Sequence, residues 1–229
     1  MNKLALCQRL ATEAEVSGAS SGTLPSATTE QTGEMLQVVR DIENAYEELQ
    51  NLRPNWLFMR EDFSFNTVSG TAAYTPTAAG LTDFRAWRTD TLRAYLTATG
   101  VADEQWLEFV PWDRFRDSYM LADQRTTPGR PLRFTVKPDK SLQFWPVPDA
   151  IYTVVGEYQL RAQTLASNSS EPLMPDNFHM ILVWMGMMNH ARRQFAQELY
   201  VQAKEKYGPL MDALKRDQLP PVGIAGPMV

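Results

Sequence analysis

The sequence contains few of the residues on which metal sites and covalent catalysis depend. Its 229 residues include one cysteine, Cys7, and two histidines, His179 and His190. One cysteine excludes an internal disulfide and is compatible with a reducing compartment; a small buried hydrophobe is a commoner role for it than a reactive thiol. The histidines lie 11 positions apart in one predicted helix, so a rise of about 1.5 Å per residue separates them by roughly 16 Å. They cannot share a metal ion, and we expect no metal site.

Catalytic motifs and long apolar runs are scarce as well. The sequence has no glycine-rich phosphate-binding loop of either common type, and we expect the carboxylate pairs Glu61–Asp62 and Asp103–Glu104 to be solvated charge. Polar residues interrupt the most apolar stretch, residues 174–193, before it reaches the ~20 apolar residues that span a membrane. The N-terminal stretch meets charged residues too early for a signal peptide. We therefore expect neither an enzyme nor a membrane protein. We also expect the protein to fold in a cytoplasm.

Positive charge is not in excess. The net charge is −5 at pH 7, whereas domains that grip nucleic-acid phosphates usually carry surplus lysine and arginine. Arginines do lie beside aromatic residues near Trp87, Trp112 and Phe134, a pattern found on single-strand-binding surfaces. Because aspartates lie between them, we favour cation–π packing and ion pairs within the β part or across a subunit boundary.

The chain is organised around residues 174–193, MPDNFHMILVWMGMMNHARR. Pro175 and Asp176 suit the first turn of a helix. Apolar residues then recur at helical spacing on two sides, which predicts a helix buried in a core. One side consists of Phe178, Ile181, Leu182, Met185, Met188 and Phe195, and the other of Met180, Val183, Trp184, Met187 and Ala191.

Three further helices are expected. Residues 2–16 predict a short amphipathic helix, followed by a Ser/Gly/Thr-rich connector at 17–33. Residues 32–52 form the clearest amphipathic helix, which Pro54 should end. After a turn near Gln194–Glu198, a last helix should kink or break at Gly208–Pro209, resume, and lead into an apolar tail rich in proline and glycine.

Between the helices, the pattern changes to short strands. Alternation at Phe63, Phe65 and Thr67 predicts a half-buried strand. Further strands are expected at 84–87 and 92–97, with a short helix at 111–121. Residues 132–137, 141–145 and 151–161 predict three strands of an antiparallel meander.

These elements predict an α+β fold. It consists of a helical bundle of about four helices interrupted by an antiparallel β domain, with an extended N-terminal tether and a C-terminal tail. The expected divisions are 1–58 for the N-terminal helices and connector, 59–170 for a mainly β insertion, and 171–229 for a C-terminal helical hairpin with the tail.

The order of these features resembles the head-to-tail adaptor, or connector, proteins of tailed bacteriophages. Structural phrases carry the resemblance over nearly the whole chain, and none is catalytic: MNKLALCQRLATEA, NWLFMREDFSF, YLTATGVADEQWLEFVPWDRFRD, GRPLRFTVKPDKSLQFWPVPD, YTVVGEYQLRAQTLA and EPLMPDNFHMILVWMGMMNHARR. The resemblance implies a structural virion protein of the head–tail junction, without reaction or cofactor. It also implies a homo-oligomeric ring of about a dozen copies that joins the portal to a tail or stopper protein. Double-stranded DNA would pass through the channel without sequence-specific binding.

Two sets of residues are candidates for contacts in such a ring. Apolar residues of the N-terminal arm and C-terminal tail are expected to contact the portal or a neighbouring subunit: Leu4, Leu10, Leu219, Val222, Ile224 and Met228. Acidic residues of helix 32–52 are candidates for the channel surface, although the sequence does not fix which face lines the channel: Asp41, Glu43, Glu47 and Glu48. Two alternatives remain open, a stopper or tail-completion neck protein and a single-stranded nucleic-acid-binding factor whose affinity falls steeply with salt.

Overall fold

The computed structural model describes residues 1–16 and 24–220, and the chain divides into two compact units. The helical unit comprises Met1–Met59 and Ala162–Val229, and the β unit comprises Arg60–Arg161. Helices and antiparallel strands are both abundant. This mixture confirms the expected α+β class.

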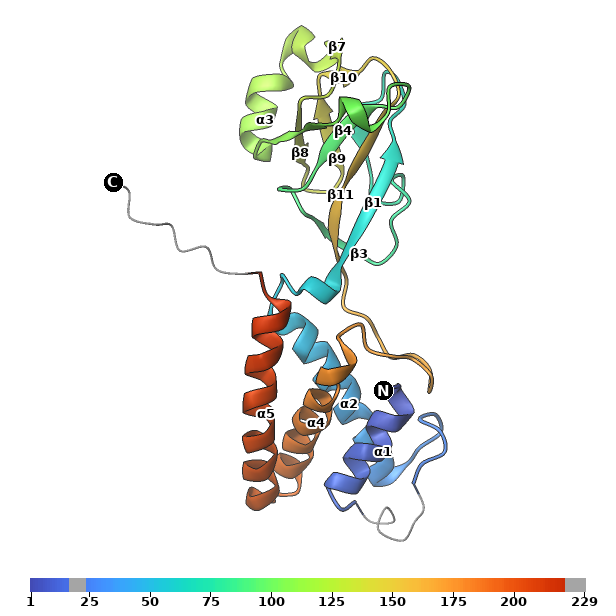
Figure 1. Ribbon diagram of the computed structural model, residues 1–229, viewed down its shortest axis with the longest axis vertical. Coiled ribbons are helices and arrows are strands. Elements are labelled where there is room, and N and C mark those ends of the chain that lie inside the picture. The colour runs from blue at the N-terminus through green and yellow to red at the C-terminus, as the bar shows by residue number, and fades with distance from the viewer. Residues whose placement is uncertain (17–23, 221–229) are drawn as a thin grey trace, which may run out of the picture. The chain divides into compact units, whose positions relative to one another are not determined.

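In the described residues, four helices build the helical unit (Figure 1): α1 (Lys3–Glu13), α2 (Gly33–Leu52), α4 (Met180–Arg193) and α5 (Gln197–Gln218). Helix α4 packs against each of the other three. Its residues 181–187 are all buried. The buried central helix expected from the sequence is therefore α4, because its apolar side chains need covering on every side.

A glycine lets α1 approach α4 closely. A Cβ atom at Gly186 would lie 2.8 Å from Leu10 Cδ2, which is closer than packed carbon atoms come. Leu10 and Leu6 are fully buried there, and Lys3 Nζ reaches Glu43 Oε1 of α2 at 2.6 Å. Helix α1 is therefore part of the core of its own unit.

Helix α5 runs unbroken from Gln197 to Gln218 although Pro209 lies inside it. Of the two outcomes expected at Gly208–Pro209, a kink or a break, the break is therefore wrong. Proline removes the backbone hydrogen bond to the Glu205 carbonyl. Pro209 and Glu205 are both exposed, so water can hydrogen-bond to that carbonyl and the helix continues.

The turn between α4 and α5 lies at residues 194–196, inside the range expected from the sequence. Phe195, in the middle of this turn, is 94% exposed and has a φ of 54°. The prediction that Phe195 continues the buried stripe of α4 is wrong, because the helix ends at Arg193 and the chain reverses there.

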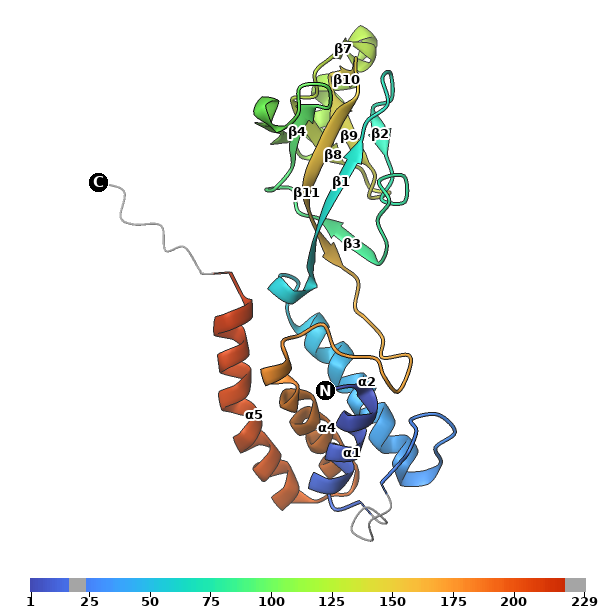
Figure 2. The same ribbon diagram turned by 45° about the vertical axis from the view of Figure 1, so that its right-hand side comes forward.

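Two main sheets form the β unit (Figure 2). The first contains, in order, β1 (Arg60–Asn66), β11 (Tyr152–Leu160), β4 (Arg93–Leu96) and β5 (Gln105–Trp106), and β3 (Phe84–Trp87) also pairs with β11. The second contains, in order, β2 (Ala73–Tyr74), β9 (Leu142–Trp145), β8 (Arg133–Val136) and β6 (Glu108–Phe109). The remaining elements are α3 (Trp112–Tyr119) and the short parallel pair β7 (Pro128–Gly129) and β10 (Val147–Pro148).

The strands lie where the alternation of apolar residues predicts them, but β11 does not pair with the strand expected beside it. Strands β8 and β9 pair antiparallel, with Phe134 opposite Phe144. Strand β11, expected beside β9, instead pairs with β1, β3 and β4 of the other sheet, so the predicted meander is wrong in its third strand. Alternation shows which face of a strand is buried but does not show which strands lie beside it.

The chain enters and leaves the β unit at neighbouring points. Arg60, where β1 begins, lies opposite Gln159, near the end of β11. The chain then rejoins the helical unit, where the Gln163 backbone N–H donates to Gln50 Oε1 at 2.7 Å and Leu165 is buried among the helices. The β unit is therefore inserted between α2 and α4 through two adjacent strand ends.

Candidate assembly surfaces

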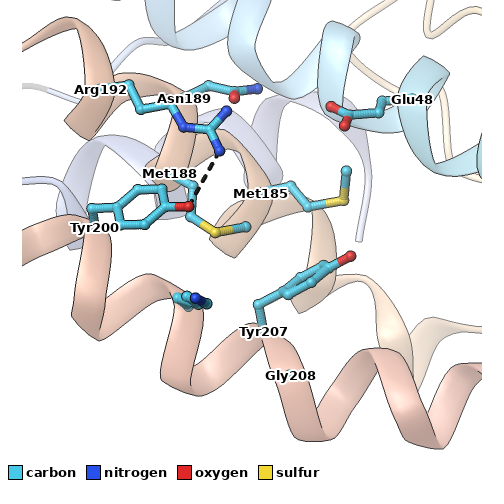
Figure 3. Close-up of a pocket in the computed structure, with 9 residues that line it drawn as sticks. Glu48, Met185, Met188, Asn189, Arg192, Tyr200, Tyr207 and Gly208 are labelled. Atoms are coloured by element: carbon cyan, nitrogen blue, oxygen red, sulfur yellow. Dashed lines mark hydrogen bonds between the residues drawn. The ribbon is translucent and has the colours of Figure 1, made fainter.

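An open groove with a volume of about 380 Å³ lies between α2, α4 and α5 (Figure 3). Met185 and Met188 of α4 lie in its middle, with Glu48 of α2 on one side and Tyr200 and Tyr207 of α5 on the other. The other residues that line the groove are Asn189, Arg192, Lys204 and Gly208. An apolar centre inside a charged rim is the usual anatomy of a protein docking site.

The two tyrosines of the groove differ in their surroundings. Arg192 Nη2 donates to Tyr200 Oη at 3.2 Å, and the guanidinium lies 5.2 Å from the ring centre. This hydrogen bond lowers the pKa of Tyr200, whereas burial raises the pKa of Tyr207. Tyr207 is thereby held in its uncharged form, and it presents an aromatic ring beside the methionines.

The four acidic candidates of α2 do not share one environment. Asp41 is only 1% exposed and binds Arg193, in the last turn of α4, through both carboxylate oxygens. Glu43 is half-buried on Lys3, while Glu47 and Glu48 are exposed. Because its carboxylate is buried against Arg193, Asp41 is unsuited to lining a channel, and only Glu47 and Glu48 present free acidic surface.

The apolar candidates are also divided. Leu10 is fully buried against α4 and Leu4 is half-buried. Leu219 packs in part against the core of the helical unit. The other three candidates, Val222, Ile224 and Met228, lie outside the described residues.

Most arginines of the β unit form ion pairs with carboxylates or stack on aromatic rings. Arg130 binds Asp103 through a bidentate pair at 2.7 and 2.8 Å, which lowers the pKa of Asp103. Arg93 stacks 5.3 Å from the ring centre of Trp106, and Arg133 stacks on Tyr119 and Trp145. The remaining ion pairs are Arg60 with Glu157, Arg88 with Asp90 and Glu157, Arg93 with Glu104, Arg116 with Asp113 and Asp117, Arg133 with Glu108, and Arg161 with Asp83.

Ion pairs or cation–π packing within the unit are confirmed for Arg88, Arg93, Arg116, Arg130 and Arg133. Asp103, expected to be solvated, is partly exposed and pairs with Arg130. Glu61 likewise accepts a hydrogen bond from Tyr158 Oη at 2.6 Å. Both carboxylates serve the structure of the β unit.

Residues 1–222 match the family described as SU10 adaptor protein. The chain belongs to this family. The resemblance to phage head-to-tail adaptors is thereby confirmed, and the adaptor has a structural role between phage head and tail. Among curated proteins, none matches the sequence.

In residues 1–16 and 24–220, no three histidine, cysteine, aspartate or glutamate side chains are grouped to hold a metal ion. No helix in the same residues combines the length and the apolar character needed to cross a bilayer. Residues 18–22 spell G-x-S-x-G, but helix α1 precedes them, whereas a nucleophilic serine turn follows a strand.

Acid should destabilise the helical unit of the adaptor. Burial lowers the pKa of His179 and of His190 from the ordinary value of 6.5. Because the unfolded chain binds these protons at a higher pH than the folded chain, the free energy of unfolding is greatest above pH 6.5. It falls between pH 6.5 and the lowered pKa values and levels off below them. Asp41 and Glu34 oppose the lowering at His190, and Arg193 adds to it.

The pH effect can be measured by urea unfolding at pH 7.5 and pH 5.5, followed by circular dichroism. The variant His190→Leu removes one titrating group, so it should lose less stability between the two pH values than the unaltered adaptor. Equal losses in the two proteins would show that His190 does not contribute.

Proposed function

We propose that the adaptor forms a closed ring of about a dozen copies that joins the portal to the tail and encloses the DNA channel. One observation carries the proposal: nearly the whole chain, residues 1–222, matches a family of phage adaptors. A ring of identical subunits with head-to-tail contacts is the simplest way to surround a duplex with one kind of protein. In this proposal the adaptor catalyses no reaction and needs no cofactor.

The distribution of charge supports a channel through which DNA moves freely. Helix α2 presents Glu47 and Glu48 to solvent, and seven arginines of the β unit are paired with carboxylates. Acidic surface repels phosphate, so DNA passes without being held and without its sequence being recognised. We assign Glu47 to the channel side on this ground, whereas Glu48 lines the groove between α2, α4 and α5.

The partners in this proposal are the portal protein, a second copy of the adaptor, a tail or stopper protein, and double-stranded DNA in passage. The site of action is the head–tail junction of the virion. The test is a cryo-EM reconstruction of the portal vertex of the parent phage without imposed capsid symmetry. A ring of this chain directly beneath the portal is the expected result, whereas a position lower in the neck would identify a stopper, and absence from the particle would overturn the proposal.

Truncation after Pro220 should abolish portal attachment. The removed residues, 221–229, include Val222, Ile224 and Met228, and their apolar side chains are our candidates for the portal contact. Leu219 stays in place because it packs on the helical core, so the circular dichroism spectrum should not change. The measurement is co-sedimentation of the adaptor with purified portal, and undiminished binding of the truncated chain would contradict the assignment.

A further inference from the structure

The α4–α5 turn presents an aromatic side chain almost completely to solvent. Phe195 is 94% exposed, more than any other large apolar residue among the described ones. Its φ of 54° places the backbone in the left-handed region, which bulky residues rarely adopt. A strained backbone that holds an apolar ring in water points to a use for that ring outside the fold of one subunit.

The groove between α2, α4 and α5 has the chemistry to receive such a ring. Methionine sulfur and thioether carbons make favourable contacts with aromatic rings and adapt to their shape, and Met185 and Met188 occupy the middle of the groove (Figure 3). Tyr207 adds an uncharged ring beside them. Phe195 of the same chain does not line this groove, so the groove is open to an aromatic ring from another copy.

We propose that Phe195 of one adaptor inserts into the groove of the next copy, between its Met185, Met188 and Tyr207. This inference rests on the proposed ring and names the contact that repeats around it. The turn and the groove are neighbouring but distinct regions, since Arg192 and Tyr200 line both the groove and the hollow beside Phe195. The contact is therefore head-to-tail, and a growing chain of copies keeps a free turn at one end and a free groove at the other. Such a contact repeats until the ring closes.

Charges around the two surfaces complement each other. Glu198, three residues after Phe195, is exposed in the first turn of α5. The rim of the groove carries both signs of charge, with Glu48 on the α2 side and Lys204 and Arg192 on the side of α4 and α5, all exposed. An insertion of Phe195 that brings Glu198 beside Lys204 pairs opposite charges, which favours the contact and fixes its orientation.

Two pairs of variants of the full-length adaptor test the contact. Phe195→Asn removes the ring but tolerates a positive φ, and Phe195→Trp keeps an aromatic anchor. Gly208→Leu fills the groove, and Gly208→Ala leaves it open; a Cβ at Gly208 meets no atom within 4 Å, so both should fold. Circular dichroism and thermal unfolding are expected to match the unaltered protein in all four.

Mass photometry and sedimentation velocity then measure assembly. Phe195→Asn and Gly208→Leu should each weaken self-association about 30-fold or more, the loss expected when a central aromatic anchor is removed. Phe195→Trp and Gly208→Ala should assemble normally. Rings formed by Phe195→Asn or Gly208→Leu would overturn the pairing and leave the proposed function standing.

A mixture of the two inactive variants gives the sharpest result. Each Phe195→Asn chain keeps an open groove and each Gly208→Leu chain keeps its phenylalanine, so the mixture should form one-to-one dimers and nothing larger. Absence of dimers, or growth of the mixture into rings, would overturn the pairing. An unaltered adaptor that stays monomeric at every concentration would overturn the pairing together with self-assembly in solution, while cryo-EM of the portal vertex decides the proposed function separately.

Discussion

Replacing Arg193 with alanine should lower the free energy of unfolding of the helical unit by about 3 kcal/mol. The substitution leaves Asp41 in place, 1% exposed and without the guanidinium that binds both its oxygens. A buried carboxylate without a partner costs far more than the net worth of the pair, because its hydration has already been lost. The loss should appear in urea unfolding followed by circular dichroism at 222 nm.

Two control variants separate the unpaired charge from other effects of this substitution. Asp41→Leu with Arg193→Leu removes both charges, so much of the stability should return. Glu47→Ala removes an exposed carboxylate of the same helix and should change stability by less than about 0.5 kcal/mol. A loss below about 1 kcal/mol for Arg193→Ala would show that Asp41 finds water or another partner.

Replacing Trp56 with alanine should cost about 4 kcal/mol of the free energy of unfolding. Trp56 is fully buried in the helical unit, beside Phe58 at a ring distance of 5.5 Å. Its Nε1 donates to the Leu49 carbonyl at 3.0 Å, one of the last carbonyls of α2, which lack partners within the helix. The substitution therefore leaves both a cavity and an unsatisfied carbonyl.

The matched variant Trp56→Phe divides these two contributions. It keeps most of the buried ring but has no donor for Leu49, so a smaller loss of about 1–2 kcal/mol is expected. Unfolding is best followed by circular dichroism, because the chain has six tryptophans and fluorescence would not report on one of them. Equal losses in the two variants would mean that the hydrogen bond, and not the cavity, dominates.

Helices were the part of the fold that periodicity could predict. The apolar spacing of residues 32–52 and 174–193 predicts α2 and α4, because each helix must bury the stripe that the spacing defines. The end of α4 was harder to place. Residues 194–196 read Gln-Phe-Ala, with neither glycine nor proline to mark a turn, and Phe195 lies seven residues after Met188, in step with the helical repeat. Phe195 is exposed because the chain reverses there, and the spacing of apolar residues does not predict where a chain reverses.

The surfaces were less accessible to sequence reasoning. Asp41 carried a usable signal: it lies three residues after Val38 and four before Ala45, so helical spacing alone places it on the buried side of α2. Nothing in the sequence indicated the groove, because its residues come from three helices that only packing brings together. The strands that pair with β11 could not be predicted either, because a strand that is buried on one face fits either sheet.

The adjacent entry and exit of the β unit bear on how the chain folds. Helices α2 and α4 pack together although more than a hundred residues separate them. Closing a flexible loop of that length costs more entropy than closing a short one, by about 0.6 kcal/mol for each doubling. Once β1 and β11 have paired, Arg60 and Gln159 are neighbours, and the segment that must close shrinks to the short stretches on either side. If the β unit folds first, the loop that must close is shorter, and the entropic barrier to assembling the helical unit is lower by about 1.5 kcal/mol.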